Sequence, residues 1–391
     1  LVDAPCAARE PLPAIEQSSD PLALREAIAE ATAMIKSAKK PAILAGVEIH
    51  RFALQQELLN LVEKTGLPVA ATLLGKSIIS ETHPQYLGVY EGAMGREDVR
   101  LGIEKADAVL ILGAFMTDIN LGIYTANLDE ANTINANSER ITIRWHHFDR
   151  ILLRDFLRGL TKALTTGKGA LKPAKRAKVK KSDTNHKAFK PQKNKLCTVK
   201  RFFERMDEYL HDDTIVIADI GDSLFGAADL TIHRRTEFIS PAYYTSMGFA
   251  VPAAIGAQMA APDLRPIVFV GDGAFQMTGQ ELGTAAKYGL NPIVFVLNNK
   301  GYTTERFINE GPYNDIHEWA YHLLPQIFRK GWGCEVRTEG ELEEALETAW
   351  THTQGFSIIN VHLDKLDRSK ALERLATRMS KHAGLKSVKT K

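Results

Sequence analysis

Two short polar motifs, each directly after an apolar run, constrain the fold of this chain more than any other feature. Gly271-Asp272-Gly273 follows the run 267–270, and Asn298-Asn299-Lys300-Gly301 closes the run 293–297. Apolar runs of this length next to glycine are typical of buried parallel strands. Residues 278–288 have the length and composition of a crossover helix. Both motifs are therefore predicted to lie at the carboxyl edge of one sheet, where open α/β sheets bind ligands.

The side chains of these motifs suit a metal ion and a diphosphate. Asp272 offers a carboxylate, Asn299 an amide oxygen and Gly301 an unhindered carbonyl, which Mg²⁺ binds together with phosphate oxygens. Gly273 and Ala274 are predicted to open a helix whose free N–H groups favour a diphosphate. Simple turns are the alternative for each motif alone, but the conjunction at this spacing favours a cofactor site.

Together the two motifs resemble the signature of thiamine-diphosphate enzymes, which hold their cofactor through Mg²⁺. Gly301-Tyr302-Thr303-Thr304-Glu305-Arg306 and Gly311-Pro312-Tyr313-Asn314-Asp315-Ile316 are similar to the pyruvate and indolepyruvate decarboxylase branch. Tyr243-Tyr244-Thr245-Ser246-Met247-Gly248-Phe249 and Ile255-Gly256-Ala257-Gln258 are similar to bacterial phenylpyruvate and indolepyruvate decarboxylases. The likeness covers most of the chain and weakens in the middle.

The resemblance implies non-oxidative decarboxylation of a 2-oxo acid to an aldehyde, with thiamine diphosphate and Mg²⁺ as cofactors. Thr304 favours an aromatic substrate such as indolepyruvate or phenylpyruvate, because pyruvate-specific relatives carry a larger aliphatic residue there. A pyruvate decarboxylase or a carboligase of the same family is the first alternative. The second alternative is a non-catalytic subunit that only binds the cofactor or a partner chain, against which Glu305 argues.

The resemblance also assigns roles to single residues. Glu305 is the expected catalytic carboxyl group beside the substrate carboxylate, where crowding and burial would favour its neutral form. A surface ion pair with Arg306 or Lys300 is the alternative for Glu305. Met247 is expected to support the folded cofactor, although by residue type alone it would be a core methionine. The expected substrate pocket consists of Thr304, Glu305 and Ile308.

Asp219-Ile220-Gly221-Asp222-Ser223 follows the strand-like run 214–218 and is similar to the turn that contacts the diphosphate and pyrimidine in these enzymes. Ile220 stands where pyruvate decarboxylases commonly have Thr, so the hydroxyl is missing at that position. The metal ligands are expected to be Asp272, Asn299 and Gly301. The residues expected to contact the cofactor are Asp222, Ser223, Thr245, Ser246, Met247, Gly271, Gly273, Ala274, Phe275, Asn299, Gly301, Tyr302 and Thr303.

Alternating helical and strand-like patterns predict an α/β fold with two doubly wound parallel-sheet domains. The 391 residues suffice for two ordinary domains. Helices are predicted over 22–37, 54–65, 97–105 and 341–352, and strands over 41–46, 68–73, 108–113, 141–145, 214–218, 237–239 and 357–362. The predicted division is an interdomain segment 1–21, a middle domain 22–166, a Lys-rich linker 167–196, a pyrophosphate-binding domain 197–369 and a basic tail 370–391.

Composition restricts the partners and the location. A net charge of +2, from 49 basic and 47 acidic residues, gives no field suited to nucleic acid or a membrane. The lysines of the linker lack the aromatic interleaving of a nucleic-acid site, although that reading is the alternative for them. Three distant cysteines without metal-ligand spacing favour a reducing cytoplasm. His146-His147 is interpreted as structural, because the catalytic His pair of these decarboxylases belongs to another domain.

The resemblance finally predicts that an amino-terminal pyrimidine-binding domain is missing, because Leu1-Val2 matches the join after that domain and no initiator Met is present. The chain is expected to be a fragment or one half of a split enzyme, inactive without that domain in cis or trans. The complete protein is expected to form a homodimer or homotetramer.

Overall fold

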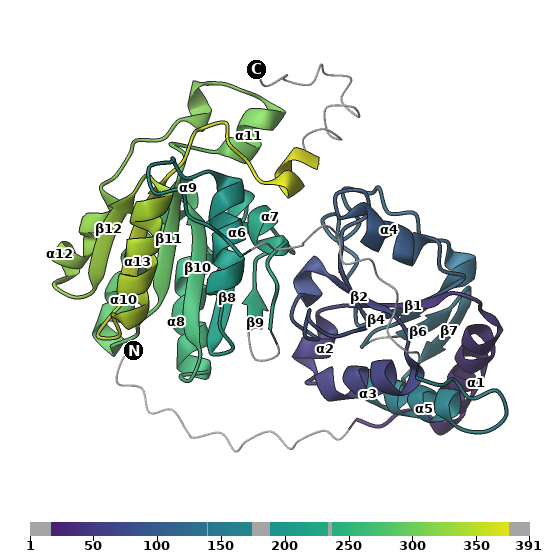
Figure 1. Cartoon of the computed structure of the whole chain (residues 1–391). Helices are drawn as coiled ribbons and strands as arrows, with labels where there is room; N and C mark the ends of the chain where they lie inside the picture. The colour runs from purple at the N-terminus through teal and green to yellow at the C-terminus, as the bar shows by residue number, and fades with distance from the viewer. Residues whose placement is uncertain (1–16, 139, 174–187, 234–236, 375–391) are drawn as a thin grey trace, which may run out of the picture.

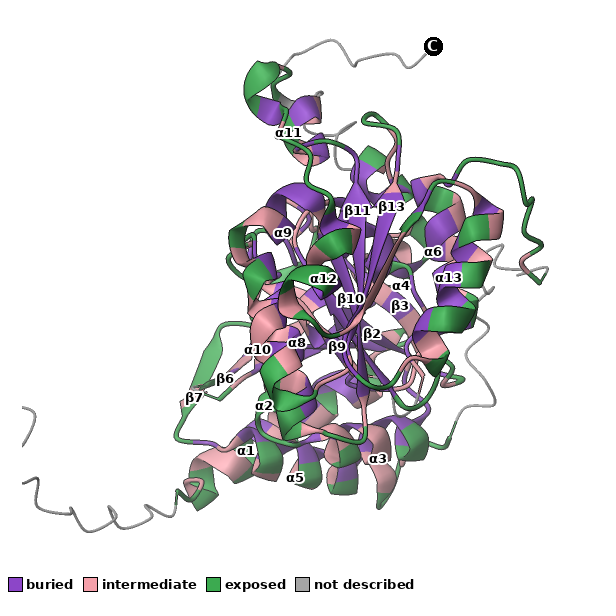
Figure 2. Ribbon diagram, turned by 90° about the vertical axis from the view of Figure 1, so that its left-hand side faces the viewer, coloured by how far each residue is buried: buried purple, intermediate pink, exposed green. Residues whose placement is uncertain are grey.

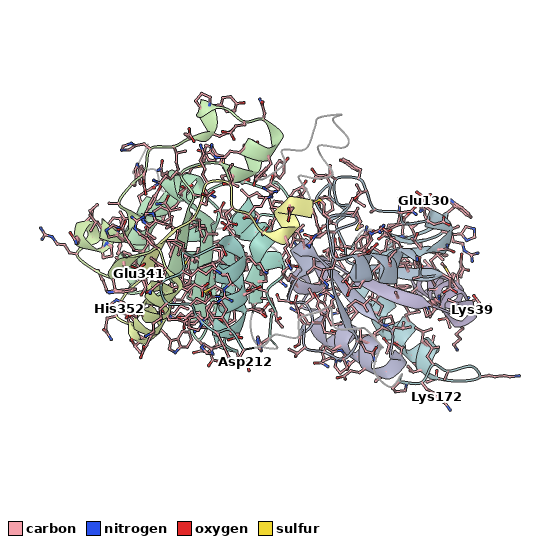
Figure 3. The ribbon with its side chains drawn as sticks, turned by 45° about the horizontal axis from the view of Figure 1, so that its top comes forward. Lys39, Glu130, Lys172, Asp212, Glu341 and His352 are labelled. Carbon is pink, nitrogen blue, oxygen red and sulfur yellow. The ribbon has the colours of Figure 1, made fainter. Side chains whose placement is uncertain are left out.

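The computed structural model of the chain describes residues 17–138, 140–173, 188–233 and 237–374. These residues form two α/β domains, each with its own sheet between helices (Figure 1). The predicted fold class is therefore confirmed. Figure 3 shows charged side chains such as Lys39, Glu130 and Asp212 at the periphery of the domains, where all three are exposed.

The middle domain contains a seven-stranded sheet in the order β3-β2-β1-β4-β5-β6-β7. Five strands run parallel, whereas β6 and β7 extend the sheet as antiparallel strands. This edge differs from the parallel sheet expected, because too few residues join β5 to β6 for a crossover helix. The strands are β1 Pro41–Ala45, β2 Val69–Thr72, β3 Tyr86–Tyr90, β4 Ala108–Leu112, β5 Thr133–Ala136, β6 Arg140–Ile143 and β7 His146–Asp149.

Helices cover both faces of this sheet. The first helix illustrates why they form: the Asp20 side chain accepts hydrogen bonds from the Leu22 and Ala23 amides, and Pro21 occupies the first helical position. Helices α1, α3 and α5 pack into one core, while α4 lies on the opposite face. The helices are α1 Pro21–Ser37, α2 Glu48–Arg51, α3 Gln55–Thr65, α4 Glu97–Glu104 and α5 Leu153–Thr165.

The second domain contains a fully parallel six-stranded sheet in the order β12-β13-β11-β10-β8-β9. Its central strands are buried along their length, as Figure 2 shows for β10, β11 and β13. Such continuous burial requires helices on both faces. The strands are β8 Thr214–Ala218, β9 Glu237–Ile239, β10 Arg265–Gly271, β11 Ile293–Asn298, β12 Trp332–Val336 and β13 Ser357–His362.

Two helical layers sandwich this sheet. Helices α6 and α13 contribute to the core on one face, where Phe202 packs edge-on against Phe269 and Phe295. Helices α8 and α10 contribute to the core on the other face. The helices are α6 Val199–Tyr209, α7 Asp222–Ala228, α8 Ala250–Ala260, α9 Asp272–Thr278, α10 Leu282–Tyr288, α11 Thr303–Ile308, α12 Leu324–Phe328 and α13 Glu339–Thr351.

The described parts of the predicted linker and tail pack against the folded domains. Residues 188–196 contact the second domain, where the Gln192 amide donates to Glu339. Residues 370–374 are helical, and Ala371 and Leu372 are buried. Arg374 Nε donates to the carbonyl of Met94 in the middle domain at 2.6 Å. The first residues of the predicted tail therefore connect the two domains, while 1–16, 174–187 and 375–391 lie outside the described residues.

A buried ion pair holds the two domains together, and we call it the latch. Lys76 Nζ lies 2.7 and 2.8 Å from the carboxylate oxygens of Glu81 and donates to the Leu230 carbonyl at 2.7 Å. Glu81 in turn accepts a hydrogen bond from the Ile232 amide at 3.0 Å. Lys76 is 1 % exposed. Two buried charged side chains of the middle domain thus form hydrogen bonds with backbone groups of the second domain.

Within the described ranges, no helix combines the length and apolar character needed to cross a membrane.

Candidate functional site

The structure brings the two polar motifs together at the carboxyl edge of the second sheet. Strands β10 and β11 are adjacent and parallel, with Gly271 opposite Leu297. Asp272 Oδ1 accepts from the Gly273 amide at 2.7 Å, and Oδ2 accepts from the Gly301 amide at 3.2 Å. The turn after β11 is thereby tied to the start of α9. This juxtaposition is the one that strand spacing predicted.

Asp272 is a buried carboxylate without a cationic partner. It is 1 % exposed, and no ion pair joins it to a basic side chain of the described residues. Burial raises the pKa of the Asp272 carboxyl to about 7, although backbone amides of Gly273, Lys300 and Gly301 act in the opposite direction. A divalent cation would favour the charged form of such a group. The electrostatics of the site therefore fit a metal ion.

Asn299 provides a second oxygen that lacks a partner. Its side chain is 8 % exposed, and its buried Oδ1 accepts no hydrogen bond from any described group. A buried unsatisfied acceptor is unusual and points to a ligand at that position. No cluster of three or more His, Cys, Asp or Glu side chains in the described ranges could hold a metal. A cation here would depend on one carboxylate together with amide, carbonyl and ligand oxygens.

Glycine is required at two positions around these oxygens. Gly301 has φ +148°, and a Cβ there would overlap the Asn314 carbonyl oxygen. A Cβ on Gly273 would overlap the ring of Tyr302. These residues let the turn after β11 approach α9 closely.

The turn after β8 contributes a residue whose role the sequence did not indicate. Asp219 accepts hydrogen bonds from the Gly248 amide at 3.2 Å and from the Ala250 amide at 2.8 Å. It thereby anchors residues 245–249 to the carboxyl edge of the sheet. Sequence reasoning missed this contact because the two hydrogen-bond donors lie 29 and 31 positions after Asp219.

Asp222 and Ser223 lie in the same turn. Asp222 accepts from the Ser369 amide at 2.8 Å through Oδ2, whereas its buried Oδ1 has no hydrogen-bond partner in the described part of the chain. Burial raises the pKa of Asp222 to about 6. Ser223 is buried, and its Oγ lies 4.0 Å from where a Cβ on Gly271 would stand. Both residues are thus next to β10, but half of the Asp222 carboxylate is engaged by the segment after β13.

The segment with Thr245, Ser246 and Met247 lies on the surface. Met247 is 44 % exposed, and Tyr244 beside it is 76 % exposed. Thr245 has a left-handed backbone with φ 54°. The alternative of a core methionine is therefore not found. An exposed apolar segment of this kind suits contact with another molecule.

Four further candidates have different surroundings. The Phe275 side chain is fully buried against Tyr321 and belongs to the core, while the expected contact of this residue with the cofactor stays a prediction. Ala274, one residue before it, is also buried. Thr303 Oγ1 donates to the Lys365 carbonyl at 3.3 Å. Thr304 Oγ1 lies 3.5 Å from the Cβ position of Gly221, which places Thr304 beside the turn after β8.

Glu305 lies on α11 and is exposed, so the burial expected of it is absent in this chain. The surface-pair alternative is not formed either. Arg306 pairs with Asp315 at 2.6 Å, and Lys300 pairs with Glu318 at 3.2 Å. The side chain of Ile308 lies outside the described residues.

The His pair of the middle domain is far from this edge in the chain and in the fold. His146 and His147 lie on the outermost strand β7, where His146 Nδ1 contacts Glu30 at 3.0 Å and His147 Nδ1 contacts Thr142 at 3.0 Å. These contacts agree with the structural interpretation.

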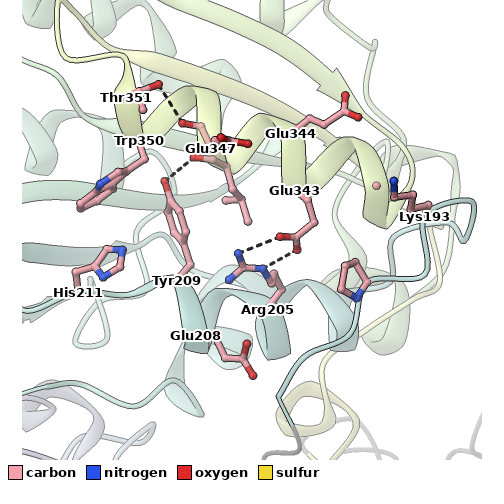
Figure 4. Close-up of a pocket in the computed structure, with 13 residues that line it drawn as sticks. Lys193, Arg205, Glu208, Tyr209, His211, Glu343, Glu344, Glu347, Trp350 and Thr351 are labelled. Atoms are coloured by element: carbon pink, nitrogen blue, oxygen red, sulfur yellow. Dashed lines mark hydrogen bonds and ion pairs between the residues drawn. The ribbon is translucent and has the colours of Figure 1, made fainter.

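A cavity of about 530 Å³ lies elsewhere, between α6 and α13 (Figure 4). Tyr209, His211 and Trp350 form its aromatic part, and Arg205 pairs with Glu343 inside it at 2.6 Å. None of the predicted site residues lines this cavity. The chemistry of the carboxyl edge, rather than the volume of this cavity, therefore identifies the candidate site.

Both domains of the chain match family models of known proteins. The family model of the central domain of thiamine pyrophosphate enzymes matches residues 28–162, and that of their C-terminal TPP-binding domain matches residues 219–361. An alpha-keto-acid decarboxylase of Mycolicibacterium paratuberculosis is 32 % identical over 88 % of this chain and 61 % of its own length. Pyruvate decarboxylase 1 of Pisum sativum is 31 % identical over 96 % and 64 %, respectively. A probable pyruvate decarboxylase of Schizosaccharomyces pombe is 30 % identical over 94 % and 65 %. The chain thus spans 61–65 % of the length of these relatives.

Proposed function

Because this chain belongs to the thiamine-diphosphate enzyme family, with relatives named alpha-keto-acid and pyruvate decarboxylases, we propose that it acts in non-oxidative decarboxylation of a 2-oxo acid to an aldehyde. The observation that carries this proposal is the pair of buried oxygens on Asp272 and Asn299. One belongs to a carboxylate without a cationic partner and the other to an amide oxygen without a donor. Both stand at the carboxyl edge of a parallel sheet.

The residues at this edge fit Mg²⁺ and a diphosphate. Asp272, Asn299 and the Gly301 carbonyl would bind the metal, which takes hard oxygen ligands and shares them with phosphate groups. Ser223 and the backbone around Gly273 would bind the diphosphate. The orphaned Oδ1 of Asn299 and the close approach required at Gly301 support this assignment.

When bound, thiamine diphosphate supplies a carbanion nucleophile and an electron sink for the departing CO₂. The chain itself would hold the cofactor, orient it and move one proton. Glu305 is the group proposed to move that proton, through its carboxyl oxygen. Because Glu305 is exposed here, the proposal requires a covering surface to bring it into a water-poor environment.

We propose a pyrimidine-binding domain, in cis or in trans, as that covering surface. The exposed side chains of Tyr243, Tyr244 and Met247 support it, because they place apolar area beside the anchored turn 245–249. The complete protein would be a homodimer or homotetramer. Cys197 and Cys334 are both free, which supports a reducing cytoplasm as its location.

Calorimetry tests the cofactor site. Thiamine diphosphate with Mg²⁺ should bind the protein, and Asp272→Ala should abolish metal-dependent binding. Asp118→Ala is the control, because Asp118 follows β4 of the other sheet and, among the described residues, its carboxylate hydrogen-bonds only to the neighbouring Ile119 amide. Equal binding by the Asp272 variant and the control would refute the assignment.

Kinetics test the substrate. With a pyrimidine-binding domain supplied, kcat/KM for phenylpyruvate or indolepyruvate should exceed that for pyruvate, since Thr304 leaves room for a ring. Thr304→Leu should move the ratio toward pyruvate by about tenfold, the usual range for a few methyl groups of fit. A preference of the unmodified protein for pyruvate would favour the pyruvate decarboxylase alternative.

Turnover of the 391-residue chain alone tests the need for that domain. With thiamine diphosphate, Mg²⁺ and phenylpyruvate, aldehyde formation should be absent or far below the typical enzyme rate of about 10 per second. A rate in that range would show that the chain needs no further domain for catalysis. It would contradict both interpretations of the chain, as a fragment and as one half of a split enzyme.

A further inference from the structure

The turn that carries Asn299 has a strained backbone that needs support from outside. Lys300, between Asn299 and Gly301, has a left-handed conformation with φ 62°. For a residue with a Cβ, this conformation is unfavourable because the Cβ approaches the following carbonyl oxygen. Asn299 also lacks a hydrogen bond at Oδ1 that would fix its side chain. The contacts of the two flanking residues therefore decide where Asn299 points.

Glu318 contacts both residues that flank Asn299. Its Oε1 accepts from Asn298 Nδ2 at 3.1 Å, and its Oε2 lies 3.2 Å from Lys300 Nζ. Asn298 is 1 % exposed and also donates to Asn360 Oδ1 at 3.0 Å. The carboxylate thus bridges one buried and one surface position across a single residue.

The segment that carries Glu318 is fixed to the other half of the site. Gln276 on α9 donates to the His317 carbonyl at 2.6 Å and to the Tyr321 hydroxyl at 2.9 Å. Helix α9 begins with Asp272. Consecutive residues 317 and 318 therefore connect the helix of one proposed metal ligand to the turn of the other.

From this arrangement we infer that Glu318 is a positioning residue for the turn 299–301, and that it sets the distance between Asn299 and Asp272 before any ligand binds. The inference rests on the proposed function for its consequence, which is tighter binding of Mg²⁺ with thiamine diphosphate. We call the contacts of Glu318 with Asn298 and Lys300 the clamp. The geometry of the clamp is independent of the proposed function.

Three variants separate the clamp from general effects. Glu318→Ala removes both contacts, together with a longer ion pair between Glu318 Oε1 and His362 Nδ1 at 3.6 Å. Glu318→Gln keeps an oxygen for Asn298 Nδ2 but loses the charge that faces Lys300. Glu343→Ala is the matched control, because Glu343 is also an ion-pairing carboxylate, with Arg205 as its partner, and its side chain is 30 % exposed against 37 % for Glu318. Glu343 lies on α13, away from the turn.

The first measurement is amide hydrogen exchange of a peptide covering 299–301, without metal or cofactor. Glu318→Ala should exchange this peptide at least tenfold faster than the unmodified protein, with Glu318→Gln in between and Glu343→Ala unchanged. The second measurement is a Mg²⁺ titration at fixed thiamine diphosphate, in which Glu318→Ala should need about tenfold more Mg²⁺ for half-saturation.

The outcomes distinguish this inference from the proposed function. If the unmodified protein binds no thiamine diphosphate with Mg²⁺, the proposed function fails, and the exchange result alone upholds or overturns the clamp. Unchanged exchange of 299–301 in Glu318→Ala would overturn it. So would a loss of Mg²⁺ affinity equal to that of Glu343→Ala.

Discussion

The carboxyl edges of the two sheets use the same architecture for opposite purposes. In the middle domain, the ends of β1 and β4 close on each other, since a Cβ on Gly46 would overlap Ala114. The charges that follow β2, Lys76 and Glu81, satisfy each other and backbone groups of the second domain. In the second domain, by contrast, the Asp272 carboxylate has no ion-pair partner and Asn299 Oδ1 accepts no hydrogen bond among the described residues.

This difference distinguishes polar groups that stabilise the folded protein from polar groups that are available to bind a ligand. A buried charge with a full set of partners is costly to remove, because its partner is left unpaired. A buried oxygen without partners costs free energy in the unliganded protein and can be removed without loss of stability. Substitutions of the latch residues should therefore lower stability, and those of Asp272 and Asn299 should lower binding.

The largest effect is expected at the latch. Lys76→Met should lower the free energy of unfolding by about 3–5 kcal/mol, because Glu81 would remain buried without its cation. Adding Glu81→Leu should recover most of this loss. Urea unfolding of both variants measures it. A single variant as stable as the unmodified protein would remove the distinction between the two edges.

Glu91, which follows β3, should make stability depend on pH. It is 3 % exposed, and burial, with Asp229 nearby, raises the pKa of its carboxyl from 4.5 to about 7, although Arg374 and Lys76 lower it. Between these values the folded state binds more protons than the unfolded state, so the stability falls as the pH rises. Above pH 7 the penalty reaches about 3 kcal/mol.

Glu91→Gln, whose side chain cannot ionise, tests the predicted direction of this pH dependence. Relative to the unmodified protein, the variant should gain stability between pH 5 and pH 8, as measured by urea unfolding at both values. An identical pH dependence of the two proteins would contradict the titration of Glu91.

Gly301→Ala should lower both stability and binding at the second edge. The new methyl group would overlap the Asn314 carbonyl, and forced packing of this kind costs about 1–3 kcal/mol. Gly256→Ala is the control, because a Cβ there meets nothing within 4 Å on helix α8. That control should be neutral or slightly more stable. Thermal unfolding and cofactor calorimetry of both variants check the contrast.

Asp272→Asn should have the smallest effect on stability. The amide keeps the shape of the side chain and removes a buried charge, which offsets the loss of one of the two backbone hydrogen bonds that the carboxylate accepts. The free energy of unfolding should therefore change by less than about 1 kcal/mol at pH 8. Metal-dependent cofactor binding should nevertheless be lost. A stability loss comparable to that of Lys76→Met would mean that Asp272, like the latch, stabilises the folded protein.

The sequence predicted the elements that are buried along their whole length. Strands β10 and β11 contain continuous apolar runs, β13 has apolar residues at 358, 359 and 361, and α1 has helical periodicity. Each was therefore predicted within a few residues of its bounds. Strands β3, β5, β7 and β12 were missed. Three of them, β3, β7 and β12, lie at sheet edges, and none of the four is buried along its whole length. The expected single helix over 278–288 is divided, because Gly279 packs closely against Phe275.

For the site, sequence spacing predicted that Asp272 and Asn299 meet, since this follows from adjacent parallel strands. Sequence spacing did not indicate Asp219 or Glu318, whose partners come from other elements and depend on how loops fold back. Nor did it indicate Lys76, because a single lysine is far more often on the surface than buried.

The latch has a consequence for how sequences related to this one should diverge. Its contacts in the second domain are made to the Leu230 carbonyl and the Ile232 amide, which any residue can offer. Selection therefore acts on the two latch residues, Lys76 and Glu81, as a unit. Loss of either charge alone leaves the other buried and unpaired and destabilises the protein, whereas joint replacement by apolar residues avoids an unpaired charge. Positions 76 and 81 are expected to covary among homologues, both charged or both apolar.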